Sequence, residues 1–408
     1  MDDHGPVPGT DDAAPDPRAV GGAPADPSLV QFSAAAGVID LAWGHPGSDL
    51  LPVDGLRAAA DRALGRYGPD ALNYGAPAGP GPLLEWLAGH VAAIDGRAPA
   101  ESELLVTGGA SQGLDLVATV LAEPGDVWLV PDPTYHLAVG IIRDHPVEVV
   151  AIETDDAGPR PEAIAGTLAR LRREGRRARF MYLVPTFGNP TGITVPLERR
   201  RAILELAAEA GLLVVEDDVY RELGFGVPAP PSLWALAPAG TVIRLGSFSK
   251  TLAPGLRLGW LSADAPTVDR LADGGLLASG GGVNHYVALV VAEHTRSGAY
   301  VAGVERLRSA LAARRDALVE SLREHLPEAT FAVPEGGYFV WLRLPGGLDA
   351  RALAPAAARH AVAYLPGSVF AVDGGGDPAT IRLAFSCYPP ADLAEGARRL
   401  GAAVAEAR

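Results

Sequence analysis

The segment SFSKTLAPGLRLGW (residues 247–260) contains Lys250, the one lysine in a chain of 408 residues that carries 34 lysine and arginine side chains. Arginine therefore occupies every other cationic position, and Lys250 marks a position that arginine does not fill. Arginine stays protonated, whereas lysine can lose its proton and attack a carbonyl carbon to form an imine. We interpret Lys250 as a nucleophilic amine. The alternative is a solvated loop lysine without a chemical role.

Composition narrows the class of protein. A chain of this length exceeds one hydrophobic core, so we expect one large domain and a smaller companion. No apolar run reaches the length of a membrane span, and the acidic, Gly/Pro-rich start is unlike a signal peptide, so we expect a cytoplasmic protein without a membrane partner. The formal charge of −15 with no basic block argues against nucleic acid. A single cysteine, Cys387, excludes an intramolecular disulfide and a thiol-based metal cluster, and we expect no metal.

The pattern of apolar runs predicts an α/β fold. Residues 1–33 are rich in Pro, Gly, Ala and Asp without periodicity, and we expect a disordered tail there. Short apolar runs then alternate with helical segments such as 111–122 and 197–211, which is typical of a mostly parallel sheet. We predict seven strands, in the runs 103–108, 126–131, 147–152, 179–185, 212–217, 241–247 and 258–263.

The texture changes after about residue 295. An amphipathic segment (304–326) leads into a predicted hairpin (331–345), a helix and a strand-like run (380–386). We predict a smaller α+β domain here. The expected division is 34–65 as the N-terminal segment of the small domain, 66–298 as the large domain and 299–408 as the C-terminal part of the small domain.

Polar residues follow the predicted strands at the point where each ends. Ligands bind at the carboxyl ends of strands in open α/β sheets, so these residues mark a site. The loop GGASQG (108–113) places glycines before a helix start, which is suited to an anion such as phosphate. The other polar residues at these ends are Tyr135, Asn189, Asp217, Asp218, Tyr220, Ser247, Ser249, Lys250 and Arg257.

The motifs and their order resemble one family. They are AWGHPGSDLLP (42–52), LNYG (72–75), GGASQGLD (108–115), PDPTY (131–135), GNPTG (188–192), VVEDDVYREL (214–223), SFSKTLAPGLRLGW (247–260), EGGYFVWL (335–342) and GGGDPATIRLAFS (374–386). The chain is similar to the fold-type I, pyridoxal-phosphate (PLP) dependent aminotransferases of class I/II, and most similar to the 2-aminoadipate and kynurenine type. The resemblance runs from about residue 38 to the C-terminus.

The resemblance implies roles for the residues around the cofactor ring. Lys250 would form a Schiff base with PLP and move the proton between the substrate Cα and the cofactor. Asp217 would pair with the ring nitrogen and keep it protonated, so that the ring accepts electrons. Asn189 and Tyr220 would hydrogen-bond the phenolic oxygen, and the Tyr135 ring would stack on the cofactor.

The resemblance also implies contacts at the two ends of the site. The phosphate would be held by Ala110, Ser111, Gln112, Ser247, Ser249 and Arg257. Tyr74 would reach the phosphate from the neighbouring subunit, which implies a homodimer with active sites at the subunit interface. Arg382 would clamp the substrate α-carboxylate bidentately. The backbone of Gly44 would complete that carboxylate site, with Asn189 and Trp43 beside the substrate.

Four residues leave the identity of the substrate undecided. Trp43 stands where similar chains usually have a small residue, so it can reshape the side-chain pocket. His45 and His136 lie beside matched motifs, and each either faces the substrate or is a packing residue. Cys387, close to Arg382 in sequence, either touches the substrate or only packs.

Three functions compete at this point. The first is a PLP-dependent aminotransferase of amino-acid metabolism that moves an amino group between an L-amino acid and a 2-oxo acid such as 2-oxoglutarate. The second is a PLP enzyme of specialised biosynthesis on the same scaffold, which would use the Cα carbanion for elimination, replacement, cyclisation or annulation. The third is a transcription regulator with an aminotransferase-like domain. It would need a basic helix-turn-helix module ahead of the fold, and the acidic residues before the first motif do not resemble one.

Overall fold

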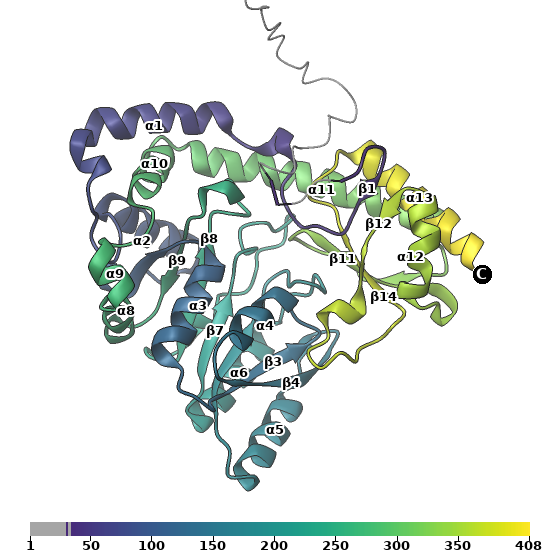
Figure 1. The fold of residues 1–408 in the computed structure, drawn as a ribbon, viewed down its shortest axis with the longest axis horizontal. Coiled ribbons are helices and arrows are strands. Elements are labelled where there is room, and N and C mark those ends of the chain that lie inside the picture. The colour runs from purple at the N-terminus through teal and green to yellow at the C-terminus, as the bar shows by residue number, and fades with distance from the viewer. Residues whose placement is uncertain (1–29, 32–33) are drawn as a thin grey trace, which may run out of the picture.

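A mainly parallel sheet forms the centre of the computed structural model, which describes residues 30–31 and 34–408 (Figure 1). Within these residues the sheet has eight strands in the order β2-β9-β8-β7-β6-β3-β4-β5. Neighbouring strands from β8 to β4 are parallel, and β9 runs antiparallel to both β2 and β8. Most of the predicted tail at residues 1–33 lies outside the described residues.

All seven predicted strands form. They are β2 (Leu104–Thr107), β3 (Val127–Asp132), β4 (Glu148–Asp155), β6 (Ala178–Leu183), β7 (Leu213–Asp217), β8 (Val242–Ser247) and β9 (Gly259–Ser262). The seven-strand prediction missed the edge strand β5 (Gly158–Pro159), which pairs antiparallel with the end of β4. Two residues are too few for a readable alternation, and the tight return depends on Gly158 at φ 96°.

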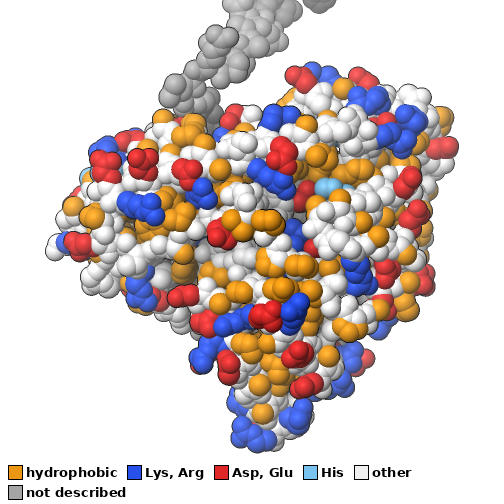
Figure 2. All heavy atoms as spheres, turned by 180° about the vertical axis from the view of Figure 1, so that it is seen from behind, with side chains coloured by type: hydrophobic (Ala, Val, Ile, Leu, Met, Phe, Trp, Pro, Cys, Tyr) orange, Lys and Arg blue, Asp and Glu red, His pale blue; other side chains and the backbone are white. Residues whose placement is uncertain are grey.

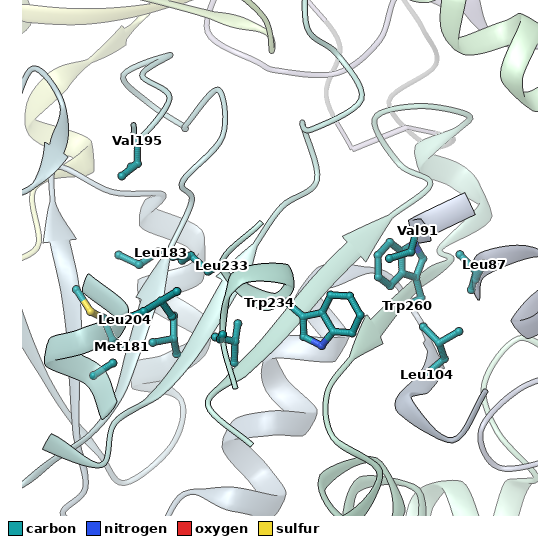
Figure 3. Close-up of a cluster of buried hydrophobic side chains, with 14 of the residues drawn as sticks. Leu87, Val91, Leu104, Met181, Leu183, Val195, Leu204, Leu233, Trp234 and Trp260 are labelled. Atoms are coloured by element: carbon teal, nitrogen blue, oxygen red, sulfur yellow. The ribbon is translucent and has the colours of Figure 1, made fainter. Parts of the chain in front are cut away.

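Both faces of the sheet are buried by helices. Successive residues of a strand point to opposite faces, so Val214 and Val215 of β7 enter two different apolar clusters. One cluster receives side chains from α2 (Gly81–Asp95), α5 (Pro161–Arg173), α6 (Leu197–Ala210) and α10 (His285–Arg296). Figure 3 shows part of it, including Trp234, Trp260 and Met181. The other cluster receives α3 (Ala110–Leu121), α4 (His136–Arg143) and α8 (Ala265–Ala272).

The C-terminal part of the chain consists of a small sheet with helices packed on it. Its four strands run antiparallel in the order β10-β11-β14-β13. The predicted hairpin is confirmed by β10 (Thr330–Phe331) and β11 (Phe339–Arg343), and the predicted late strand by β14 (Thr380–Ala384). The same part contains β13 (Leu365–Pro366), α11 (Ala299–His325), α12 (Ala350–Arg359) and α13 (Pro390–Ala407).

The N-terminal segment joins the two parts. β1 (Ile39–Asp40) pairs in parallel with β12 (Val362–Ala363), so the first described strand adds to the C-terminal part. The following helix α1 (Val53–Tyr67) packs instead on α10, through Ala59 and Ala63 against Leu289 and Val290 (Figure 1). We keep the predicted division at residues 65 and 298 as a proposal.

The surface carries interspersed charges. On the face drawn in Figure 2, acidic and basic side chains alternate, and apolar side chains lie between them. Within the part of the chain that the structure describes, no helix combines the length and apolarity needed to cross a membrane.

The part of the chain that contains the large sheet also includes the short helices α7 (Leu233–Leu236) and α9 (Gly275–Gly280).

Candidate active site

Lys250 lies just after β8, at the carboxyl edge of the sheet. Its Nζ donates a 2.8 Å hydrogen bond to the carbonyl oxygen of Gly44, which belongs to the segment after β1. The rings of Tyr338 and Tyr220 lie near the amine, with centroids 5.5 and 5.9 Å from Nζ. Burial and the nearby Arg382 guanidinium lower the pKa of Lys250 to about 8. About a tenth of this amine is therefore uncharged and nucleophilic at pH 7, far more than for an ordinary lysine.

Asp217 lies at the end of β7 as a buried carboxylate. Its Oδ2 accepts a 2.7 Å hydrogen bond from the hydroxyl of Tyr182, and its Oδ1 is buried without a hydrogen-bond partner among the described residues. Burial raises the pKa of Asp217 to about 6. Sequence reasoning missed Tyr182, although a hydroxyl inside the buried strand β6 must find a partner and so signals one.

Arg382 on β14 presents its guanidinium between two aromatic rings. The ring centroids of Phe339 and Phe370 lie 4.1 and 4.8 Å from its Cζ. Its Nη1 donates a 2.7 Å hydrogen bond to Oδ1 of Asn189, and its Nη2 donates to the carbonyl of Ala42. Its Nε is buried, and no described group accepts from it. Burial lowers the pKa of Arg382 to about 10, so the group stays charged and can bind a carboxylate.

The loop before α3 forms the end of the site suited to phosphate. Gly109 has φ 97°, and a Cβ there would lie 3.0 Å from Nη2 of Arg257, so glycine lets the backbone approach that side chain. Arg257 donates to the carbonyl of Gly108 at 3.3 Å, and the Gly108 amide donates to Oε1 of Gln112 at 2.9 Å. The unpaired backbone N–H groups of the first turn of α3, at Ala110 and Ser111, favour an anion.

Two serines close the same end. Oγ of Ser247 accepts a 3.0 Å hydrogen bond from the amide of Ser249, which fixes the turn that leads into Lys250. Both residues lie at the end of β8 or directly after it, so the phosphate end and the amine share one short segment.

Tyr220, Tyr135 and Trp43 complete the enclosed part of the site. Tyr220 is buried, and its pKa is raised by burial. Tyr135 is half-buried ahead of α4, and burial together with the Asp217 charge raises its pKa to about 12. Trp43 is half-buried between Ala42, which accepts from Arg382, and Gly44, which accepts from Lys250.

The predicted phosphate contacts Ser111 and Arg257 are exposed, and Tyr74 is exposed as well. The exposed fraction of Tyr74 is 84%, on the loop that follows η2 (Gly68–Leu72). Every other predicted site residue lies on the loops, the strands or the first turn of α3 described above.

The family model for aminotransferase class I and II matches residues 37–400. The chain belongs to this family. A curated 2-aminoadipate transaminase from Thermus thermophilus is 36% identical over 383 residues, which cover 92% of each chain. Kynurenine aminotransferase from Pyrococcus horikoshii, solved in complex with PMP, is 33% identical with a TM-score of 0.86 and 93% of each chain covered. The α-aminoadipate aminotransferase from Thermus thermophilus, solved with N-(5'-phosphopyridoxyl)-L-leucine, is 34% identical with a TM-score of 0.82, covering 91% of this chain and 93% of that chain.

The predicted family, fold class and cofactor are thereby confirmed. The protein is an aminotransferase that moves amino groups, and its cofactor is pyridoxal phosphate. The side chains of this aminotransferase fit that cofactor. Asp217 offers a buried acceptor for a protonated ring nitrogen, α3 offers an anion site, and Lys250 offers an amine that loses its proton more readily than an ordinary lysine. Gly44 lets its segment approach the site, because a Cβ there would lie 2.3 Å from Cζ of Phe339.

A buried ionic cluster lies beneath the site of the aminotransferase. Asp218, next to Asp217, accepts from the guanidinium groups of Arg221 and Arg244. Both arginines also contact Asp95 at the end of α2. The cluster therefore ties the strand ends that carry Asp217 and Lys250 to the helix layer below.

The residues left open by the sequence lie around the same site. The His136 ring meets the Phe370 ring edge to face at 5.0 Å, and burial with the Arg382 charge lowers the pKa of His136 to about 4. His45 directly follows Gly44, and its Nε2 lies 3.3 Å from Sγ of Cys387. Tyr338, which sequence reasoning also missed, donates a 2.8 Å hydrogen bond to the Lys250 carbonyl.

Proposed function

We propose that this aminotransferase takes the amino group from an L-amino acid with a long or aromatic side chain and passes it to a 2-oxo acid such as 2-oxoglutarate, with Lys250 holding the cofactor covalently through its amine. The observation that carries the proposal is the buried Lys250 amine, which interacts electrostatically with the Arg382 guanidinium and the Asp217 carboxylate and whose pKa is lowered to about 8. When bound, pyridoxal phosphate supplies an aldehyde that takes up the amino group and a ring that accepts negative charge from Cα.

The chain's own residues would hold the cofactor by its edges. Oδ1 of Asp217 would accept from the ring nitrogen, and Tyr220 and Asn189 would hydrogen-bond the phenolic oxygen. Tyr135 would stack on the ring. The phosphate would bind at Ala110, Ser111 and Gln112 of α3, together with Ser247, Ser249 and Arg257.

Lys250 would move the proton at the reacting carbon. An amine with a pKa near 8 can accept a proton from the substrate Cα and release it again at neutral pH. Its 2.8 Å hydrogen bond to the carbonyl of Gly44 holds the amine beside the segment that includes Trp43. Arg382 would fix the substrate by its α-carboxylate, with the Gly44 backbone, Trp43 and Asn189 around it.

The substrate class rests on relatives of known activity. Proteins that are similar to this chain are named for 2-aminoadipate, aromatic amino acids and kynurenine. These names favour amino-group transfer over the specialised carbanion chemistry, for which no observation speaks. We place the reaction in the cytoplasm.

A homodimer with shared active sites is part of the proposal. Tyr74, Leu72 and Leu276 are exposed at 84%, 72% and 72%, which is unusual for large apolar side chains and suits a surface covered by a second copy. Tyr74 would then reach the phosphate of the partner's site. Co-expressed Lys250→Ala and Tyr74→Ala subunits test this. Hybrid dimers with one intact site would restore roughly a quarter of wild-type activity if subunits pair at random, and no recovery would contradict a shared site.

An absorbance titration tests the reaction itself. The purified protein is expected to show the near-visible band of bound pyridoxal phosphate. Adding glutamate, 2-aminoadipate or an aromatic amino acid should bleach this band, and 2-oxoglutarate should restore it. A band that persists with every donor would contradict the proposed transfer.

A further inference from the structure

The one cysteine of the chain is paired with a histidine beside the catalytic amine. Sγ of Cys387 lies 3.3 Å from Nε2 of His45. A second contact joins the same two segments, because the Ser386 hydroxyl donates a 2.8 Å hydrogen bond to the backbone carbonyl of His45. The adjacent residue, Gly44, accepts from Nζ of Lys250. These contacts therefore hold the Cys387–His45 pair next to Gly44, the residue that accepts from Lys250.

The protonation of this pair follows from its surroundings. Burial raises the pKa of the Cys387 thiol to about 11, so at neutral pH the thiol keeps its proton. Burial and the Lys250 charge lower the pKa of His45, so the imidazole is neutral. A protonated thiol is a donor, which makes Nε2 of His45 the acceptor and places the imidazole proton on Nδ1.

The Nδ1–H group that results has no acceptor on the described part of the chain. Nδ1 of His45 is buried, and none of the described residues makes a hydrogen bond with it. Buried polar groups are almost always paired, and an unpaired one requires a ligand or another role. We propose that the Cys387–His45 pair is a specificity element that presents Nδ1–H of His45 to an oxygen acceptor on the side chain of the amino-acid donor. This inference rests on the proposed function.

The chemistry of the pair selects the class of side chain. The cations that act on Lys250 are Arg382 and Arg257, and the proposed function assigns them to the α-carboxylate and the phosphate. A neutral imidazole donor can pair with either a carbonyl or a carboxylate oxygen. The favoured donors are thus amino acids that carry such an oxygen beyond Cβ, over isosteres with methylene or methyl groups in its place.

Two matched donor pairs separate the two sources of the oxygen. 2-Aminoadipate and norleucine have chains of the same length that end in a carboxylate or a methyl group. Kynurenine and 2-amino-4-(2-aminophenyl)butanoate carry the same aminophenyl ring, with and without a side-chain carbonyl. For each pair, the ratio of kcat/KM values is measured with 2-oxoglutarate as acceptor in the wild-type holoenzyme and in each variant.

The variants isolate the Nδ1 donor. His45→Leu removes the donor. For the donor pair whose side-chain oxygen accepts from His45, the ratio of kcat/KM values is expected to fall about 10-fold. The fall should come from a higher KM, with kcat little changed. His45→Asn keeps an N–H donor near the Nδ1 position and should restore most of the preference. Cys387→Ala frees the tautomer and should give a smaller fall, whereas Cys387→Ser, with a hydroxyl donor, should not. His360→Leu, on the surface beside Glu406, is the matched control.

Each outcome decides one question. A fall in the 2-aminoadipate ratio alone assigns a carboxylate, and a fall in the kynurenine ratio alone assigns a carbonyl. Equal changes for all four donors, or no change, would show that His45 only packs, and the inference would be wrong. If His45→Leu does not fold, Cys387→Ala and His45→Asn carry the same comparison. A wild-type enzyme that transfers from none of the donors would overturn the proposed function instead.

Discussion

Tyr182 donates a 2.7 Å hydrogen bond to Oδ2 of Asp217, and this bond sets which carboxylate oxygen is left for a ligand. Both groups are buried between β6 and β7, where burial favours a protonated carboxyl. The hydroxyl donor opposes that effect, because a hydrogen bond to the ionised form lowers the pKa of Asp217. Tyr182 is therefore a positioning residue that keeps Asp217 ionised with Oδ1 available.

Removing that hydroxyl should move the acidic limb of the activity profile. In Tyr182→Phe the pKa of Asp217 is expected to rise above its value of about 6, so more of the carboxyl is protonated at neutral pH. We expect kcat/KM to fall about 10-fold at pH 8, one lost hydrogen bond to a charged group, and further at pH 6. The measurement is kcat/KM against pH. Tyr364→Phe removes another buried hydroxyl, bonded to the Ala350 carbonyl, and should leave the profile unchanged.

The lowered pKa of Lys250 should appear in cofactor capture. The uncharged amine attacks the aldehyde, so the rate at which cofactor-free enzyme binds pyridoxal phosphate covalently should rise with pH and level off above about 8. An ordinary lysine, at 10.5, would keep accelerating beyond about pH 9. Stopped-flow absorbance measures the rate. Borohydride reduction should add the pyridoxyl mass to the wild type and none to Lys250→Ala.

Replacing Arg382 by lysine should show how much the planar guanidinium contributes to carboxylate binding beyond its positive charge. Arg382→Lys keeps a cation but loses the planar group held between Phe339 and Phe370 and one of its donors to Asn189 or Ala42. We expect KM for the amino donor to rise about 100-fold, the loss of a bidentate charged pair, with a smaller fall in kcat. A donor amine without a carboxylate should react at the same rate with both enzymes, and a preserved difference there would contradict the assignment.

The sequence predicted the strands, and it marked most of the residues of the candidate site, because both follow local rules. Each of the seven strands was marked by an apolar run, and polar residues such as Asp217 and Lys250 followed those runs directly. The residues that were missed depend on contacts far apart in the chain. In the sequence, Tyr182 is one more aromatic residue in a strand, and its hydrogen bond to Asp217 exists only because β7 lies beside β6. Phe370 packs against the Arg382 guanidinium only once the C-terminal part is folded.

The pairing of His45 with Cys387 shows the same limit. The two residues are 342 positions apart, and no periodicity links them. β14 carries the chain to Cys387 and the segment after β1 carries it to His45, so only the packing of those two elements brings the side chains into contact. The exposure of Tyr74 likewise depends on the shape of the folded surface, which cannot be predicted from the sequence alone.

The buried ionic cluster should control stability more than any surface pair. The Asp95 side chain is fully buried and accepts from the guanidinium of Arg244 and from the amide and hydroxyl of Ser232, while Arg221 lies 3.3 Å away. Asp95→Ala would leave the buried guanidinium groups of Arg221 and Arg244 with Asp218 as their one remaining ion-pair partner among the described residues, and we expect the free energy of unfolding to fall by about 3–5 kcal/mol. Denaturant unfolding followed by circular dichroism measures the change. Asp54→Ala, which breaks the exposed pair with Arg57, should cost less than about 1 kcal/mol. Equal losses in the two variants would mean that the cluster is solvated and does not anchor the strand ends beneath the site.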